Sequence, residues 1–447
     1  MLSEEESRAL TGKIISFVRA DDALVRVTSQ KYSHLRFAAN SFLTSGVTDT
    51  AGALIRVWVG KKRGEAFTND LSDAALKQAV DQAESFARLS PVDVEYLPTL
   101  PGQNYKPTLE FSEATANISL QGRARTVNDA IAAAEKAGVI GAGFHQVDLT
   151  TRAEATTHGN FVYRRSSLVS LAMTARTRDG AGSGYFLRSH FEAPRLDTAR
   201  ISREAIRRAV ESHGARELPA RPYPVILEAQ AVADIMSSTS IFDARGADEG
   251  RSAFSAPGGA TRLGQQVFDE RVNIVSDPWR AELPGSPWAQ DGIPAEVVHI
   301  VRNGVLETLV NTRYWAAQKN RQPTPGSVNT ILESSGKTAS IEEMVAASKR
   351  ALLVSRFWYI RSLEPRTASV TGLTRDGVWY IENGRVQYPV RNFRFNQSIV
   401  RMLAPGNVDM IGASERVGGS EDQGSNPSLF PALKLRAFNF TSQSEAI

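Results

Sequence analysis

Two Asn-Gly dipeptides constrain the fold of the C-terminal half more than any other feature of the sequence. Asn303-Gly304 and Asn383-Gly384 each lie between runs of β-favouring residues. A type I′ turn needs positive φ at both central positions, so each dipeptide predicts a two-residue hairpin. The second hairpin is expected to pair Glu382 with Arg385, Ile381 with Val386, Tyr380 with Gln387 and Trp379 with Tyr388. This register gives an apolar face and a face with a Glu382–Arg385 ion pair, which indicates a half-buried antiparallel sheet.

The chain is too long for one ordinary core, because it has 447 residues. Prolines at 91, 98, 101 and 107 interrupt the periodic patterns, and a second break lies at 218–222. We predict an α+β protein with four parts: an N-terminal α/β domain (1–90), a linker (91–110), a middle α/β domain that can pack with the first as one unit (111–218), and a mostly antiparallel β domain with hairpins and a few helices (219–447).

Local signals place the main helices and strands. Ser3 with Glu6 and Ser340 with Glu343 form capping boxes, which predict helices at the N-terminus and over 341–354. Further helices are expected around 76–87, 126–138 and 200–213. Strands are expected at 24–28, 34–38, 53–59, 139–150, 152–157, 161–164 and 168–177. Within a Gly/Ser/Pro-rich tail after Gly418, the apolar stretch near 429–440 is expected to add an edge strand.

Composition excludes several classes of function. Without cysteine the chain has no disulfide, thiolate ligand or thiol nucleophile. A net charge of +4 with scattered arginines gives no support for a nucleic-acid partner. The acidic N-terminus lacks the apolar core of a signal peptide, and no apolar run approaches the ~20 residues of a membrane span. We therefore expect a cytoplasmic protein with no membrane partner.

Residue chemistry alone assembles no active site. The six histidines stand apart, with no pair at the i, i+4 spacing of a helical metal site. His299 is expected in a strand opposite Thr308, in a structural role, and His158 at a turn. No G-x-S-x-G motif is present, so a hydrolase serine has no support.

Several segments resemble a known family. The clearest are 368–373 (Ala-Ser-Val-Thr-Gly-Leu) and 379–390 (Trp-Tyr-Ile-Glu-Asn-Gly-Arg-Val-Gln-Tyr-Pro-Val), and further matches lie at 36–40, 64–72, 302–306 and Tyr314. By these motifs and the order of elements, the chain resembles the TldD/PmbA family of metallopeptidase subunits, specifically its TldE-like branch. The resemblance implies a proteolytic complex. TldD-like subunits carry a zinc-binding HExxxH helix and a downstream cysteine and cleave unfolded or leader peptides as extended strands, and TldE-like subunits pair with them without those ligands.

With the register taken from the strand expected over 224–227, the HExxxH positions fall on residues 237–242. Ser237 and Phe242 then stand in place of the two histidines and Ser238 in place of the glutamate. Neither a hydroxyl nor a phenyl group offers an imidazole lone pair or a general base, and the cysteine ligand is impossible. The resemblance therefore implies no catalytic residue, metal or cofactor in this chain, with zinc in the HExxxH-bearing partner subunit.

A role in holding an extended peptide substrate is still open to this chain. Arg356, Trp358, Tyr359 and Arg361 are candidates for lining a peptide groove or the partner interface, although strand alternation would turn half of them to the core. The loop 243–265, with Asp248, Glu249 and Arg251, is a candidate lid or interface, or else a solvated loop.

Three hypotheses follow for the whole protein. The first is a TldE-like subunit of a metallopeptidase, able to form a homodimer without its partner. The second is a self-sufficient peptidase whose metal is held by His145, His158 or His190 brought together in space. The third is a regulatory or binding protein without a proteolytic role.

Overall fold

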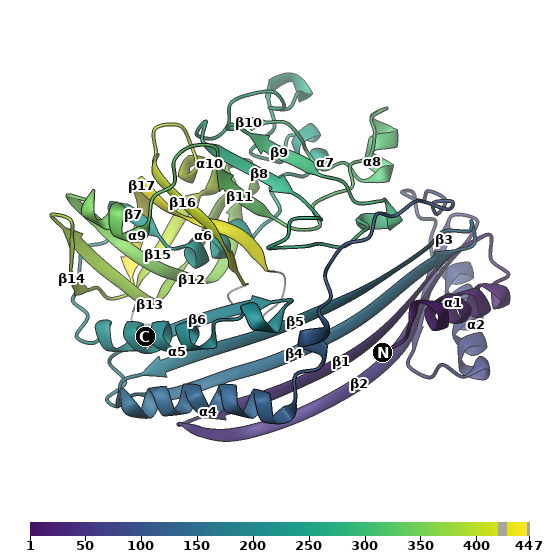
Figure 1. Ribbon diagram of the computed structural model, residues 1–447. Helices are drawn as coiled ribbons and strands as arrows, with labels where there is room; N and C mark the ends of the chain where they lie inside the picture. The colour runs from purple at the N-terminus through teal and green to yellow at the C-terminus, as the bar shows by residue number, and fades with distance from the viewer. Residues whose placement is uncertain (419–426, 445–447) are drawn as a thin grey trace.

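A computed structural model describes residues 1–418 and 427–444 and shows two large sheets (Figure 1). The first is a six-stranded antiparallel sheet in the order β3-β2-β1-β4-β5-β6. Because β1 and β4 are neighbours, strands from both sides of the proline-rich segment share this sheet. Several predicted short strands are halves of longer ones. The strands are β1 (Asp22–Ala38), β2 (Ser41–Val59), β3 (Lys62–Thr68), β4 (Ile140–Thr156), β5 (Phe161–Arg176) and β6 (Ser183–His190).

Four helices cover one face of this sheet, with α1 and α2 toward one end and α4 and α5 toward the other (Figure 1). Odd-numbered apolar residues such as Val25, Val27 and Ile55 pack under α1 and α2, and Leu171 and Met173 pack under α4 and α5. The even-numbered positions consequently face the other way. These helices, with the short α3, are α1 (Glu4–Phe17), α2 (Asp73–Leu89), α3 (Glu113–Ala116), α4 (Leu120–Lys136) and α5 (Thr198–Glu211).

The C-terminal domain is built on an 11-stranded sheet, part of which closes into a barrel. Strand β17 pairs with β15, β15 with β13, β13 with β12, β12 with β7, and β7 again with β17. Buried aromatic rings fill this part of the core, with Phe357 stacked on Phe438 at 5.3 Å. The barrel strands are β7 (Pro222–Leu227), β12 (Arg350–Glu364), β13 (Ser369–Glu382), β15 (Phe393–Ser398) and β17 (Ser428–Gln443).

Shorter elements complete the C-terminal domain. No helix in the described ranges is long and apolar enough to cross a membrane. The other elements, apart from four short 3-10 turns, are α6 (Ala229–Met236), α7 (Ala244–Asp248), β8 (Val272–Ser276), β9 (Val298–Arg302), β10 (Val305–Leu306), α8 (Arg313–Gln318), β11 (Ile331–Ser334), α9 (Ile341–Ala346), β14 (Arg385–Pro389), α10 (Ile399–Met402) and β16 (Val408–Val417).

Both predicted hairpin turns are confirmed, with positive φ at Asn303, Gly304, Asn383 and Gly384. The register of the second hairpin is right for Glu382–Arg385 and Ile381–Val386. A bulge then places Tyr380 opposite Tyr388 and Trp379 opposite Pro389, so the two outer predicted pairs are wrong. Glu382 forms its ion pair with Arg350 on the neighbouring strand.

Three other local predictions are wrong. The ladder between β9 and β10 ends at Leu306, and Thr308 donates its backbone N–H to Ile300, so the predicted His299–Thr308 pair does not form; His299 pairs with Val275 of β8 on the other side. The helix that starts at Ile341 ends at Ala346, because Leu352 and its neighbours pair with β7 as strand β12. The stretch near 429–440 is not an edge strand: β17 pairs with β7, β11, β15 and β16. Residues 419–426 of the predicted tail lie outside the described ranges.

Candidate functional site

A charged groove lies on the face of the six-stranded sheet that the helices leave uncovered. Even-numbered side chains of neighbouring strands form its floor, among them Arg26 of β1, Arg152 and Glu154 of β4, and Arg164 of β5. The loop 283–291 and residues 327–330 of the C-terminal domain form the opposite wall. The groove encloses about 940 Å³, within the usual range of ligand sites.

Two buried carboxylates organise the arginines of the floor. Glu154 accepts hydrogen bonds from Arg26 at 2.8 Å and from Arg152 Nε at 3.0 Å. Burial raises the pKa of Glu154, but the two arginines outweigh burial and hold the pKa below its ordinary value. Glu110 accepts from Arg164 Nη1 at 3.0 Å, and here burial prevails and raises the pKa. The floor is therefore a fixed array of charges.

An aromatic side chain joins this array from the C-terminal domain. The guanidinium carbons of Arg152 and Arg164 lie 5.6 and 5.5 Å from the centroid of the buried Trp288 ring. Tyr105 packs edge-on against the same ring at 6.4 Å and donates to the carbonyl of Gly292 at 2.6 Å. Trp288 thus combines an apolar surface with the positive side chains of the floor.

A smaller cavity of about 280 Å³ adjoins the groove and shares Leu24, Arg56, Glu154 and Asp291 with it. At its edge, Thr99 Oγ1 lies 2.9 Å and Asp22 Oδ1 3.2 Å from the same nitrogen, Nδ1, of His158. A hydrolase triad needs the acid and the nucleophile on different ring nitrogens. Since Thr99 also donates from its hydroxyl and its backbone to Asp22, this cluster fixes the segment around Thr99.

The residues expected at the zinc-motif positions serve the local fold. Ser237 caps the C-terminal end of α6, and the Ser238 hydroxyl donates to the carbonyl of Ile235 at 2.6 Å. The Phe242 ring stacks on Phe254 at 5.3 Å and packs against the main core. These side chains do not fit a zinc ion. Within residues 1–418 and 427–444, no group of three or more histidine and acidic side chains is arranged to hold a metal.

The three histidines of the second hypothesis lie at different places in the N-terminal sheet. His145 is buried in β4, and burial and nearby Arg123 lower its pKa to about 4. His190 ends β6, and burial, Arg416 and Arg195 lower its pKa to about 4. His158 belongs to the turn between β4 and β5 described above.

The predicted peptide-binding residues of β12 do not share one surface. Arg356 is buried between the domains, 3.6 Å from Asp376 and 4.2 Å from the Tyr185 ring. Trp358 is half-buried, and the guanidinium carbon of Arg375 lies 4.1 Å from the centroid of its ring. Tyr359 has a left-handed backbone and is exposed beside Arg361. None of the four lines the charged groove.

The loop 243–265 is tied to its surroundings by charged contacts. Asp248 accepts from Trp315 Nε1 at 2.8 Å and from Arg321 at 2.7 Å. Arg245 pairs with Glu95 of the proline-rich segment at 2.6 Å, and Glu249 pairs with both Arg245 and Arg251. The Arg245–Glu95 pair connects the loop to the N-terminal half, and the Asp248 contacts connect it to α8 and the residues that follow.

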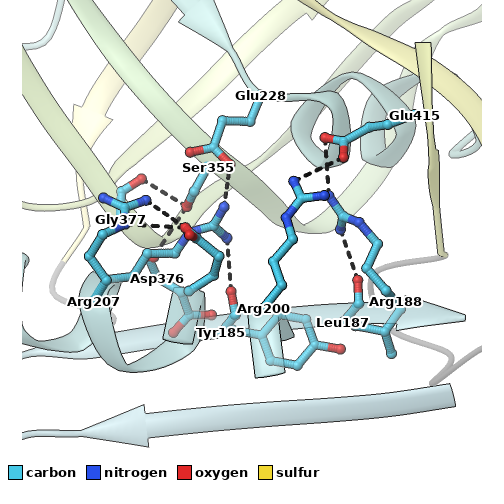
Figure 2. Close-up of polar contacts among 12 residues, drawn as sticks. Tyr185, Leu187, Arg188, Arg200, Arg207, Glu228, Ser355, Asp376, Gly377 and Glu415 are labelled. Carbon is cyan, nitrogen blue, oxygen red and sulfur yellow. Dashed lines mark hydrogen bonds and ion pairs between the residues drawn. The ribbon is translucent and has the colours of Figure 1, made fainter. Parts of the chain in front are cut away.

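A second polar cluster joins the domains beside the groove (Figure 2). Arg188 and Arg200 both reach Glu415 of β16, at 3.1 and 3.2 Å, and lower the pKa of its carboxyl although burial alone would raise it. Arg208 pairs with Glu228, a carboxyl whose pKa burial raises. The groove therefore lies between two firmly connected parts.

The charged groove was not predicted, although one part of it has a visible signal in the sequence. Arg152 and Glu154 alternate with the buried alanines Ala153 and Ala155, the pattern of a strand with one charged face. The convergence of Arg26, Arg164 and Trp288 on that face depends on pairings between distant segments, which no local pattern reveals.

Comparisons with known proteins agree with this architecture. Models of the PmbA/TldA metallopeptidase domain 1, central domain and C-terminal domain match residues 23–87, 113–212 and 220–442. The chain is 25% identical over 417 residues to a metalloprotease PmbA homolog of Haemophilus influenzae, and the match covers 90% of each chain. It is 23% identical to a metalloprotease of Methanothermobacter thermautotrophicus, and that match covers 82% of this chain and 83% of the relative. The structure of TldE from Thermococcus kodakarensis has the same fold, with a TM-score of 0.83, 16% identity and coverage of 97% of this chain and 99% of that one. The chain therefore belongs to the TldD/PmbA metallopeptidase family.

Proposed function

We propose that this chain is a TldE-like, non-catalytic subunit of a two-subunit metallopeptidase that acts on unfolded or leader peptides. The observation that carries the proposal is the structural role of the residues at the expected zinc-motif positions. Ser237, Ser238 and Phe242 cap a helix and pack against the core, whereas a zinc peptidase needs two imidazoles and a general base there. The names of the relatives, metalloprotease and TldE, support the proteolytic setting.

An open edge of the first sheet suits a partner subunit. Strand β3 pairs with β2 only over 53–59, and no described strand pairs with the outer side of 41–52. Phe42, Leu43 and Val47 on this stretch are each more than half exposed, and Asp49 is its only charged residue. Long apolar edges with free backbone groups pair with strands of other chains. We infer that residues 41–52 contact the HExxxH-bearing subunit.

Co-expression with a tagged HExxxH-bearing homologue from the same host tests the proposal. The expected result is an equimolar complex that contains zinc by elemental analysis and cleaves unfolded casein, while the pure chain holds no stoichiometric zinc and cleaves nothing. Zinc and cleavage in the pure chain would establish a self-sufficient peptidase instead. Failure of the homologue to bind, with no cleavage after mixing, would favour a binding or regulatory protein.

A further inference from the structure

Arg416 marks one end of the charged groove and bridges the two domains. It lies on β16, and its Nε donates to the carbonyl of Ser189 on β6 at 2.9 Å. Its Nη1 donates to the carbonyl of Glu282, the residue before the groove-lining loop 283–291, also at 2.9 Å. Both acceptors are neutral backbone groups, so the positive charge has no counterion from these contacts.

The charge of Arg416 is not matched by any acidic side chain in the described part of the protein. Glu415, its neighbour in sequence, is committed to Arg188 and Arg200 on the other side of β16. Burial lowers the pKa of Arg416 to about 10. A partly buried cation without a counterion is unfavourable, and an anionic ligand would remove that penalty.

The groove also contains Arg164, whose charge is already used. Arg164 donates from Nη1 to Glu110, and its Nε is buried and closed to a ligand in the groove. The groove lining also includes small polar side chains, which are Ser166, Ser167, Ser286, Thr330 and Ser428. The groove therefore offers small polar groups and space for a ligand around Arg416.

We propose that the charged groove binds a peptide through one of its carboxylate groups, with Arg416 as the counterion. A guanidinium presents paired N–H groups that match the two oxygens of a carboxylate. The Trp288 ring and the adjoining cavity give the rest of an extended peptide a continuous surface. The choice of a peptide as ligand rests on the proposed function, and the binding itself requires only this chain.

Fluorescence anisotropy with the purified full chain tests this site. The probes are a short extended peptide with one glutamate and an amidated C-terminus, its glutamine counterpart, and that counterpart with a free C-terminal carboxylate. We expect at least one carboxylate peptide to bind about tenfold more tightly than the neutral amide, the fold-change of one charge-assisted contact. The comparison between the two carboxylate peptides identifies whether the group comes from a side chain or a chain end.

Variants connect the preference to Arg416. Arg416→Gln is expected to abolish the preference for carboxylate, Arg416→Lys to reduce it, and Arg401→Gln, an exposed arginine of α10 away from the groove, to leave it unchanged. Equal binding of all three peptides, an unchanged preference in Arg416→Gln, or binding of inorganic phosphate without any carboxylate peptide would overturn the proposal. The peptide comparison on the unaltered chain decides the matter even where Arg416→Gln fails to fold.

The outcomes also separate this site from the proposed function. Carboxylate-selective binding by a chain that recruits no HExxxH-bearing homologue would leave the site standing and remove the subunit role. An active complex without carboxylate preference would support the subunit role and remove the carboxylate site.

Discussion

Arg208 of α5 and Glu228, the residue before α6, form an ion pair that is almost wholly excluded from solvent. The pair connects the helix-covered sheet to the C-terminal domain. Arg208 also donates to the carbonyl of Tyr185 at 2.9 Å, and the backbone N–H of Glu228 donates to the carbonyl of Val354 on β12, which orients the start of α6. Together with the contacts of Arg188 and Arg200 to Glu415, this pair holds the two domains together.

Removal of one partner of this pair is expected to destabilise the protein strongly. Arg208→Met leaves the Glu228 carboxylate buried without its cation, so the free energy of unfolding should fall by about 3 kcal/mol in urea titrations. The double variant Arg208→Met/Glu228→Leu should recover most of this loss, because it removes both charges. Glu211→Gln, which breaks the exposed Arg207–Glu211 pair, is the matched control and should change stability by less than about 0.5 kcal/mol. Equal losses of unfolding free energy in Arg208→Met and Glu211→Gln would contradict the role assigned to the buried pair.

Stability should decline below neutral pH because of His145. Its pKa is about 4 in the folded chain, below the ordinary value of 6.5 for a histidine, so the unfolded chain binds the proton more readily. The contribution of neutral His145 to the unfolding free energy is therefore complete above pH 6.5 and is lost as pH falls toward 4. This contribution is about 3 kcal/mol at most. The urea midpoint of His145→Phe, measured from about pH 8 to 4, should vary less with pH than that of the unaltered chain. His299→Gln serves as a control, and an identical slope in His145→Phe would contradict the prediction.

The turn of the second hairpin should tolerate no side chain at Gly384. Its φ is +73°, and a Cβ there would lie 2.8 Å from the carbonyl oxygen of Ala346. Gly384→Ala is therefore expected to lower the unfolding free energy by about 2–3 kcal/mol, through left-handed strain and overlap together. Gly60, at φ +58° with open space around it, is the matched position. Gly60→Ala should cost about 1 kcal/mol, and a similar loss at both sites would show that the contact with Ala346 contributes nothing.

A charge on the open edge of β2 should weaken association with the partner subunit. Val47→Lys places a cation on the stretch 41–52, and lysine on an edge strand opposes pairing with another chain. Co-purification of the HExxxH-bearing homologue should fall severalfold while the unfolding temperature stays unchanged. Val386→Lys, at a similarly exposed valine of β14, should leave co-purification intact. Loss of the partner in both variants, or in neither, would argue against this edge as the interface.

The sequence was most informative where structure is decided locally. The Asn-Gly turns and the capping boxes at Ser3 and Ser340 were predictable, because each depends on the backbone preferences of a few adjacent residues. The overall α+β class followed from the same local patterns. Predictions failed where distant segments decide: Leu352 joins a strand because it pairs with Val225, against the helical periodicity of its neighbours.

The candidate site shows the same division. Arg152 and Glu154 belong to a recognisable alternating strand, but their neighbours Arg26 and Arg164 arrive through pairing with β1 and β5. Arg416 has no distinguishing sequence context, and its exceptional position follows from carbonyls of Ser189 and Glu282 in two separate segments. Such a site is a property of tertiary structure and has no contiguous motif.

The closure of the barrel by β17 has a consequence for biosynthesis. Its partner β7 is the first strand of the C-terminal domain to leave the ribosome, whereas β17 is the last. Until β17 emerges, β7 lacks a neighbour on one side and the phenylalanines of the interior lack Phe438 and Phe440. Pairing over such a long stretch of chain is slow and leaves apolar surface available to chaperones or to aggregation. Nascent chains released before residue 428 should therefore be degraded, whereas the helix-covered sheet is already complete in sequence by then.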